Sequence, residues 1–457
     1  MAFAVKLVNM ETRLEKCTPI VEEDKYKENY EKLKELLSPQ VKELEIKSLK
    51  KSVKIGGEYV MLRHELTYIN PTAIAVDVDD TMSREDLVKR IDFVEHFKFV
   101  YLGRELTLDL LAIRNVSGDP DKFKDTVKFV SENTSLPLVL CSLDPKAIDA
   151  ALSVMPIPDA LPLVYAATKD NWREMADIVL KYKVPLAVFS PGDLNMLVTL
   201  VNTLLKCGVE DLALDPGTFV GMNGLRYTLG AFTTLRWKAC NDDYKLAGFP
   251  LIGTPITAWK TVDGDVKQKM WWETITAALL MARYADLLIM HSLEGWSYLP
   301  LVIWRFNLYT DPRRPVAVEP GLRIIGNPDE KSPIFVTGNY ALTYSLVSMD
   351  IESGKVDCYL LITDTEGIAV ECAVPGKKFL PENIAELLKS SGLENMVKHK
   401  VLVIPGKAAR LSGDIEDATG WRVLVGPMDS KDIPKFVSEK WKPDVLKEIL
   451  GDDVFKE

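Results

Sequence analysis

The chain has 457 residues, of which 47% are hydrophobic and 27% charged, and its formal net charge is −10. This composition is typical of a globular protein with two or three domains and excludes a disordered or fibrous chain. The acidic balance, without a Lys/Arg stripe interleaved with aromatic residues, disfavours nucleic-acid binding. Because no run of 18 apolar residues and no secretory signal is found, we expect a cytoplasmic protein that does not span a membrane.

Cysteine and histidine show no ligand spacing along the chain. The six cysteines, at positions 17, 141, 207, 240, 358 and 372, are dispersed without a C-x-x-C pair. Because a chain of this size does not need disulfide bonds for stability, the cysteines are expected to be reduced thiols. The four histidines, at 64, 96, 291 and 399, give no metal-binding pattern, and His399, between two lysines, is expected to be a solvated surface residue.

Residues 20–50 predict an amphipathic helix followed by a charged connection. From about residue 60, eight short apolar runs alternate with amphipathic segments, which predicts repeated βα units. The runs begin at Thr72, Leu108, Leu136, Leu161, Val184, Asp211, Phe249 and Asp286. Eight such units indicate a closed TIM (β/α)8 barrel, placed at residues 59–325 after an N-terminal segment of residues 1–58.

Helix-start signals support these units at Ser83, at Asp119 with Pro120, at Asp144 with Pro145, and at Asn171. Functional residues of such barrels follow the strands. The candidates at this mouth are Asp77, Asp79, Asp80, Arg114, Asn115, Ser142, Asp144, Thr168, Lys169, Asp215, His291 and Glu294. For Asp144 and Asn171 a capping role is favoured over a functional one, whereas for Asp215 the two interpretations are even.

After Asp311 the chain becomes rich in proline, which predicts an extended connection between domains. A second, smaller α/β domain of Rossmann-like or flavodoxin-like type is expected at residues 326–457, because four further apolar runs alternate there with segments of helical sequence pattern. Within it, residues 336–370 pair two strand-like runs with clusters of glycine, threonine and asparagine. Such residues let the backbone approach a large ligand closely, so this stretch predicts a pocket wall.

Several segments carry a family resemblance in order: NLYTDPRRPVAVE (307–319), VTGNYALTY, YLLITDTEG, VIPGKAARLSGDIEDATGW (403–421) and VLVGPMDS (423–430). Together they resemble the large (gamma) subunit of the corrinoid iron-sulfur protein of the acetyl-CoA decarbonylase/synthase complex, in its archaeal form. The resemblance implies a methyltransferase-type methyl carrier. It would take a methyl group from a methyltetrahydropterin of the methanopterin or sarcinapterin type and deliver it to an acetyl-CoA synthase subunit. Its expected constant partner is a small (delta) TIM-barrel subunit.

The implied cofactor is a corrinoid held base-off, with no protein histidine on cobalt, and no protein residue is expected to be catalytic. The expected binding residues are Thr337, Asn339, Thr343, Thr365, Gly367, Ile368, Ala369, Val370, Gly406 and Ser430. Of these, Thr365 is expected beneath cobalt. Taken without the resemblance, the threonines are ordinary strand formers and the glycines ordinary turn residues.

Members of this family also carry a four-iron, four-sulfur cluster on four cysteines near the amino terminus. By resemblance, Cys17 holds the position of the fourth ligand, and the three preceding cysteines are not found in this sequence. One thiolate cannot hold such a cluster. The chain as given is therefore expected to lack it, with residues 1–58 as a remnant of the iron-sulfur domain and a linker helix.

Two other functions stay open from the sequence. One is a TIM-barrel enzyme that converts a pterin or another small molecule and carries a regulatory C-terminal domain. The other is a structural scaffold subunit of a larger complex.

Overall fold

A computed structural model describes residues 2–8 and 12–450. The chain forms two compact units, Met1–Phe99 with Leu106–Thr310, and Val100–Glu105 with Asp311–Glu457. The second unit thus begins before the expected boundary at residue 326. Within the described ranges, no helix has the length and apolar character needed to cross a membrane.

Eight parallel strands form the barrel of the first unit, in the order β10-β9-β8-β7-β6-β3-β12-β11. An isolated parallel bridge between Leu214 and Leu251 joins the two ends of this order, so the sheet closes. The strands are β3 (Ala73–Asp79), β6 (Leu110–Arg114), β7 (Leu138–Cys141), β8 (Leu163–Ala167), β9 (Leu186–Phe189), β10 (Leu212–Asp215), β11 (Ile252–Gly253) and β12 (Leu287–Met290). Each lies in a predicted apolar run, which confirms the TIM barrel.

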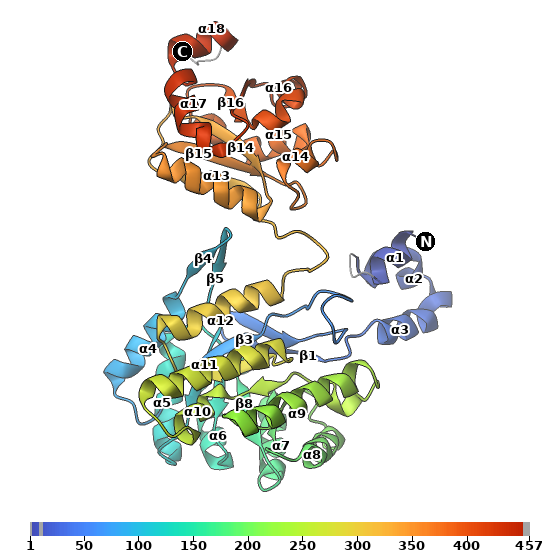
Figure 1. Ribbon diagram of the computed structural model, residues 1–457. Coiled ribbons are helices and arrows are strands. Elements are labelled where there is room, and N and C mark those ends of the chain that lie inside the picture. Colours follow the sequence, from blue (N-terminus) through green and yellow to red (C-terminus); the bar gives the residue numbers. More distant parts are fainter. Residues whose placement is uncertain (1, 9–11, 451–457) are drawn as a thin grey trace. The chain divides into compact units, whose positions relative to one another are not determined.

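Helices surround the barrel (Figure 1). They are α4 (Arg84–His96), α5 (Pro120–Asn133), α6 (Pro145–Leu152), α7 (Trp172–Tyr182), α8 (Leu194–Lys206), α9 (Met222–Cys240), α10 (Ala258–Thr261), α11 (Val266–Ala282) and α12 (Gly295–Leu308). Ser83, Asp119 and Asp144 cap α4, α5 and α6 through their side chains, as predicted. Asn171 precedes α7 without capping it, because its Oδ1 accepts a hydrogen bond from Thr168 N at 2.6 Å instead.

The amino-terminal part holds α1 (Ala2–Val8), α2 (Thr18–Glu22), α3 (Lys27–Leu36) and an antiparallel hairpin of β1 (Glu43–Lys47) and β2 (Ser52–Gly56). The expected helix is found as α3, but the expected charged connection is a hairpin. Leu44, Ile46 and Ile55 are buried among the inward-facing residues of the barrel strands. Because Lys47 pairs with Leu161, just before β8, the hairpin closes the amino-terminal end of the barrel.

The second unit contains a five-stranded sheet in the order β13-β15-β14-β16-β17. Its strands are β13 (Gly321–Ile325), β14 (Ile334–Gly338), β15 (Cys358–Thr363), β16 (Val401–Ile404) and β17 (Arg422–Val425). Only β13 pairs antiparallel within this sheet. The residues from Val100 to Glu105 come from a hairpin of β4 (Phe99–Tyr101) and β5 (Arg104–Leu106).

Helices cover both faces of this sheet, since each face has its own apolar core. One core includes side chains of α14 (Val370–Ala373), α15 (Pro381–Ser390) and α16 (Ser412–Thr419). The other includes side chains of α13 (Ala341–Ser353), α17 (Ile433–Lys440) and α18 (Pro443–Leu450). Short 3-10 turns complete the chain: η1 (Leu14–Lys16), η2 (Asp24–Tyr26), η3 (Lys245–Ala247), η4 (Pro255–Thr257), η5 (Leu393–Asn395), η6 (Gly406–Leu411) and η7 (Ser430–Asp432).

The prediction that His399 is a solvated surface residue is wrong. Its side chain is buried just before β16, where the ring packs against Trp441 at 5.1 Å between centroids. Its Nε2 lies 2.9 Å from Ser332 O, and Val401 N donates to its Nδ1. Burial lowers the pKa of His399 below its ordinary value, which favours the neutral ring.

Candidate functional site

A cavity of about 510 Å³ lies in the second unit, at the carboxyl ends of three parallel strands. Its lining includes Thr337 of β14, Ile404 of β16 and Gly426 after β17, with α13 forming one wall. The chain leaves β14 for its neighbour β15 on one side and later returns to β16 on the other. In open α/β sheets, the crevice at such a reversal of strand order is the usual ligand site.

The predicted binding residues divide into two groups around this cavity. Those that line it are Thr337, Thr343, Ala369, Val370 and Ser430. The others are not part of the lining but hold the adjoining turns: Asn339, Thr365, Gly367, Ile368 and Gly406. Half of the predicted residues therefore line the cavity and half lie on its supporting loops, and their role in cofactor binding stays a prediction.

Asn339 fixes the turn that follows β15. Its Oδ1 accepts hydrogen bonds from Thr365 N at 3.0 Å, Thr365 Oγ1 at 2.9 Å and Gly367 N at 3.0 Å. Its Nδ2 donates to Asp364 Oδ1 at 2.9 Å. Because Asn339 and Thr365 are both buried, their polar atoms are satisfied inside the protein, and the Thr365 hydroxyl lies within the loop.

Two glycines permit close backbone approaches beside the cavity. A Cβ on Gly406 would lie 2.8 Å from Met428 Sδ and 3.0 Å from Gly426 O. Gly367 has φ +73°, and a Cβ there would lie 2.8 Å from Pro315 O. Only glycine adopts the backbone of Gly367 at no steric cost, and at Gly406 a side chain would meet Met428 and Gly426. Both positions therefore fix the course of loops that border the cavity.

The cavity wall combines aliphatic side chains with the ion pair of Glu371 and Lys407 and with the carboxylate of Asp429. Leu342, Leu346 and Val347 of α13 contribute apolar surface, a set that the sequence analysis missed because it resembles an ordinary helix face. At the rim, Lys407 Nζ lies 2.5 Å from Glu371 Oε2 and lowers the pKa of that carboxyl. Such a wall suits a large, mostly apolar ligand with polar substituents.

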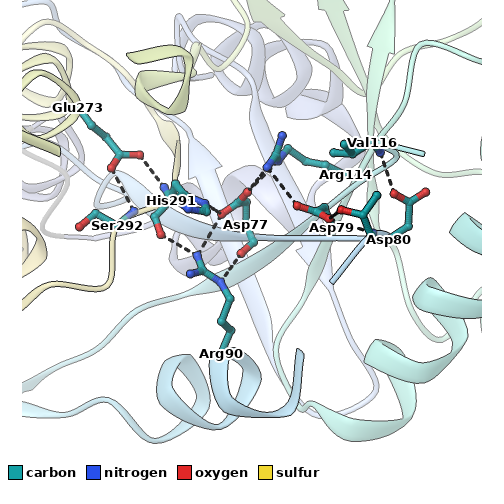
Figure 2. A network of polar contacts seen from close by, with 10 residues as sticks. Asp77, Asp79, Asp80, Arg90, Arg114, Val116, Glu273, His291 and Ser292 are labelled. Atoms are coloured by element: carbon teal, nitrogen blue, oxygen red, sulfur yellow. Dashed lines mark hydrogen bonds and ion pairs between the residues drawn. The ribbon is translucent and has the colours of Figure 1, made fainter. Parts of the chain in front are cut away.

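A second polar site lies at the mouth of the barrel (Figure 2). Asp77 of β3 is fully buried, and its carboxylate is 2.6 Å from His291 Nδ1 and 3.1 Å from Arg90 Nη2. On the other side, Arg114 donates from Nε to Asp77 Oδ2 at 2.7 Å and lies 3.5 Å from Asp79 Oδ2. Despite opposing burial, these three partners hold the pKa of Asp77 below its ordinary value.

Glu273 of α11 completes this mouth network, and the sequence analysis missed it. Its buried carboxylate accepts hydrogen bonds from His291 N at 2.6 Å and Ser292 N at 3.0 Å, and burial raises its pKa. A glutamate in mid-helix carries no sequence signal for such a role. Asp80 accepts from Val116 N at 2.9 Å and so fixes the loop after β6.

The remaining mouth candidates have local partners. Asp215 is buried and accepts from Tyr165 OH at 2.8 Å and Gly217 N at 2.7 Å, and burial raises its pKa to about 6. Asn115 Nδ2 donates to Ser142 Oγ at 3.1 Å. The Thr168 hydroxyl donates to Asn171, whereas Lys169 and Glu294 are exposed.

Cys17 borders a surface pocket with Pro19, Ile20, Tyr26 and Leu33 as neighbours. Across residues 2–8 and 12–450, no three His, Cys, Asp or Glu side chains form a group that could hold a metal ion. The iron-sulfur prediction for Cys17 is untested by this geometry and stays a prediction.

Comparisons with known proteins identify relatives of the chain. A family model described as CdhD, CO dehydrogenase/acetyl-CoA synthase delta subunit, matches residues 43–437. Acetyl-CoA decarbonylase/synthase complex subunit gamma 2 of Methanosarcina thermophila is 42% identical over 445 residues, which are 97% of this chain and 94% of the relative. The gamma subunit of Methanothermobacter thermautotrophicus is 42% identical over 439 residues, 96% of this chain and 94% of the relative.

Among solved structures, dihydropteroate synthase from Xanthomonas albilineans in complex with 7,8-dihydropteroate has a TM-score of 0.40 and 15% identity, covering 52% of this chain and 94% of its own. The enzyme from Thermus thermophilus has a TM-score of 0.40 and 13% identity, covering 59% of this chain and 100% of its own.

The family description names a delta subunit, whereas the relatives that align over nearly the full chain are named gamma. The chain therefore belongs to the CO dehydrogenase/acetyl-CoA synthase (CdhD) family, and its relatives named above are gamma subunits of the acetyl-CoA decarbonylase/synthase complex.

Proposed function

We propose that this subunit is a methyl carrier that holds a corrinoid at the cavity of its second unit. It takes a methyl group from a methyltetrahydropterin of the methanopterin or sarcinapterin type and delivers it to the acetyl-CoA synthase subunit. The observation that carries this proposal is the cavity at the carboxyl ends of β14, β16 and β17, lined by residues that the family resemblance singles out.

The chemistry of the cavity fits a corrinoid. Parallel strands in the order β15-β14-β16-β17 with helices on both faces make a Rossmann-like arrangement, whose ligands bind at the reversal between β14 and β16. A corrinoid is larger than the cavity of about 510 Å³, so only part of it can enter. The exposed side chains of Leu342 and Met428 offer apolar surface at the rim for the remainder.

The residues of the chain would hold and orient the group through many weak contacts. Thr337, Thr343 and Ser430 line the cavity with hydroxyl-bearing side chains that are suited to the amide substituents of a corrin ring. The Ser430 hydroxyl donates to Asp350 Oδ2, so toward a ligand it can act as an acceptor. When bound, the corrinoid supplies the cobalt that takes up and gives up the methyl group. No histidine or cysteine is among the lining residues, and His399 lies at the amino end of β16, away from the cavity, so no imidazole or thiolate of the lining would be available to bind the cobalt.

Family membership places the chain in a multi-subunit complex, and we propose a small TIM-barrel (delta) subunit as its constant partner. The second candidate function is a pterin- or small-molecule-converting barrel. The observation that favours it is the close approach of His291 to Asp77 at the barrel mouth, at 2.6 Å. A scaffold role has no specific observation in its favour.

The test is cobamide uptake by the chain co-purified with the small barrel subunit. Added hydroxocobalamin should be retained and should show a base-off spectrum that shifts on reduction and again on methylation. Thr343→Val, which removes one hydroxyl at the cavity, should weaken retention about three- to tenfold, given what one hydrogen bond contributes. Ser353→Ala, at the far end of α13, should leave it unchanged.

A colourless complex that retains no cobamide would refute the carrier function. If the same protein bound a tetrahydropterin tightly and converted it without cobamide, the barrel enzyme would be the better description. Iron and sulfide analysis of the same sample would test the separate prediction for Cys17.

A further inference from the structure

A carboxylate lies directly behind one hydroxyl of the cavity in the second unit. Ser430, the first residue of η7, lines the cavity, and its Oγ donates a hydrogen bond to Asp350 Oδ2 on α13. Asp350 itself is not part of the cavity lining. Its contact with the cavity therefore runs through the Ser430 hydroxyl.

The stability of α13 does not account for Asp350. The residue lies in the last turn of the helix, where the partial negative charge of the helix end makes a carboxylate unfavourable. Among the described residues no lysine or arginine forms an ion pair with it, and Ser430 is the only hydrogen-bond partner of its carboxylate. The contact with Ser430 is thus the interaction that explains this side chain.

Asp350 fixes the direction of the Ser430 proton. An ionised carboxylate can only accept hydrogen bonds, so the single hydroxyl proton of Ser430 has to point toward Asp350. The lone pairs of Ser430 Oγ are what remains for a ligand. Toward the cavity, Ser430 is therefore an acceptor and not a donor.

The hydroxyls of Thr337 and Thr343 differ from that of Ser430 in this respect. Thr337 is only 2% exposed, yet within the described part of the chain neither threonine hydroxyl has a hydrogen-bond partner. Both can donate or accept toward a ligand. The cavity thus combines one hydroxyl of fixed polarity with two of free polarity.

A primary amide and a carboxylate meet this arrangement in opposite ways. The amide NH2 group can donate to Ser430 Oγ, and its oxygen can accept from a free hydroxyl. A carboxylate is ionised at neutral pH and has no proton to donate, so it would face the Ser430 lone pairs with the charge of Asp350 behind them. The charged lining residues act in the same direction, because Glu371 and Asp429 outnumber Lys407.

We propose that Asp350 is a positioning residue that holds the Ser430 hydroxyl as an acceptor, so that the cavity selects primary amide substituents over carboxylates. This inference rests on the proposed function, which places a corrinoid at the cavity, and adds the chemical class of that corrinoid: its side chains are amidated. Because an amide and a carboxylate have nearly the same shape, the selection acts through unmatched polarity and charge rather than through size.

The test compares hydroxocobalamin with its separated monocarboxylic acid derivatives, in each of which one amide is hydrolysed. The full chain with the small barrel subunit is used at pH 7, and the measured quantity is the selectivity, the Kd of a derivative divided by the Kd of hydroxocobalamin. Asp350→Asn is the main variant, because an asparagine can donate to Ser430 Oγ and so frees the hydroxyl proton to turn toward the ligand. Glu352→Gln is the matched control, since it removes an exposed carboxylate from the same turn of α13.

The wild type should retain at least one derivative about tenfold more weakly than hydroxocobalamin. Asp350→Asn should lower that selectivity several-fold, to within about threefold of unity, whereas Glu352→Gln should change it less than about twofold. In a Ser430→Ala background, Asp350→Asn should have no further effect on selectivity, because the hydroxyl through which it acts is gone.

Three results would overturn the positioning role. If Asp350→Asn weakens retention of both ligands equally, the residue only ties α13 to η7. If selectivity falls just as much in the Ser430→Ala background, the charge of Asp350 acts by itself. If the wild type retains hydroxocobalamin and every derivative alike, the selection is refuted and the carrier function stands, whereas a wild type that retains no cobamide refutes the proposed function and this inference with it.

Discussion

Replacing Asp77 with asparagine tests whether the barrel mouth is a structural ion network. The substitution keeps the shape of the side chain and removes its charge. In the wild type, Asp77 Oδ1 lies 2.6 Å from His291 Nδ1 and 3.1 Å from Arg90 Nη2, while Oδ2 lies 2.6 Å from Arg114 Nη2. An asparagine amide group would direct N–H donors at one of these guanidinium or imidazole donors.

The expected loss in unfolding free energy depends on the positive charges that Asp77→Asn leaves without a partner. Removing one partner of a buried ion pair costs about 3–5 kcal/mol, because the other charge is left without compensation. Here the side chains of Arg90 and Arg114 are 17% and 24% exposed, and Arg114 keeps Asp79 as a partner at 3.5 Å. Partial access to water places the expected loss in unfolding free energy at the lower end, about 3 kcal/mol.

Urea unfolding near pH 7 measures this loss, with hydrogen exchange of β3 and β6 assigning it to the barrel. The matched control is Asp149→Asn, which breaks the exposed ion pair with Lys181 at 2.8 Å and should cost less than about 0.5 kcal/mol. Because the folded-state pKa of Asp77 is lowered, its contribution is complete above its ordinary pKa of 3.8 and fades as the pH falls below it. Equal losses for the two variants at pH 7 would refute the network.

Three further changes probe burial and backbone. Burial raises the pKa of Glu58 from 4.5 to about 8, so the free energy of unfolding of the wild type should fall as the pH rises between those values. In urea unfolding, the stability of Glu58→Gln relative to the wild type should therefore increase from pH 5 to pH 8. A difference that stays constant with pH would contradict this. Gly367→Ala combines φ +73° with a contact 2.8 Å from Pro315 O and should cost roughly 3 kcal/mol in thermal unfolding. Gly392→Ala, with φ +71° and open space, should cost only about 1 kcal/mol, and equal costs would exclude the close approach. Asn339→Ala leaves two backbone N–H groups unpaired and should lose about 2–4 kcal/mol and retain less cobamide, whereas unchanged retention would separate the loop from the cavity.

The barrel was predictable because its signals are local and repeated. Each parallel strand is buried on both faces, so it appears as a short apolar run regardless of its tertiary partners. The capping residues Ser83, Asp119 and Asp144 mark helix starts by chemistry that acts within three residues. Closure of the sheet into a barrel could be predicted from the number of such units, which is eight.

Features that depend on distant contacts were not predictable in the same way. The β1–β2 hairpin has lysine and glutamate between its apolar residues, so the alternation of Leu44 and Ile46 was hidden in a charged stretch. His399 stands between exposed lysines, but burial alternates over residues 397–400, ahead of β16, and places its side chain inside. For Glu273, only the fold brings the middle of α11 to the His291 backbone.

The same contrast applies to the candidate sites. The cavity-lining residues Thr337, Thr343 and Ser430 were found through motif order, not through any property of a single residue. The α13 wall was missed because Leu346 and Val347 are indistinguishable from core residues in sequence. Which helix positions face a cavity rather than a core is decided by packing that no local pattern records.

The state of the polar groups distinguishes the two candidate sites. At the barrel mouth, both oxygens of Asp77 already have cationic or imidazole partners within 3.1 Å, so a pterin could reach this carboxylate only by displacing one of them. Breaking such a buried contact costs about 3–5 kcal/mol, which is more than the roughly 1.5–3 kcal/mol that a ligand hydrogen bond to a charged group returns. The cavity of the second unit makes no such demand, since its wall is largely aliphatic and its ion pair between Glu371 and Lys407 lies at an exposed rim. Ligand entry there exchanges water for apolar surface, which is favourable without rearrangement of charge. The balance of free energy therefore favours the cavity of the second unit over the barrel mouth as the site of the proposed cofactor.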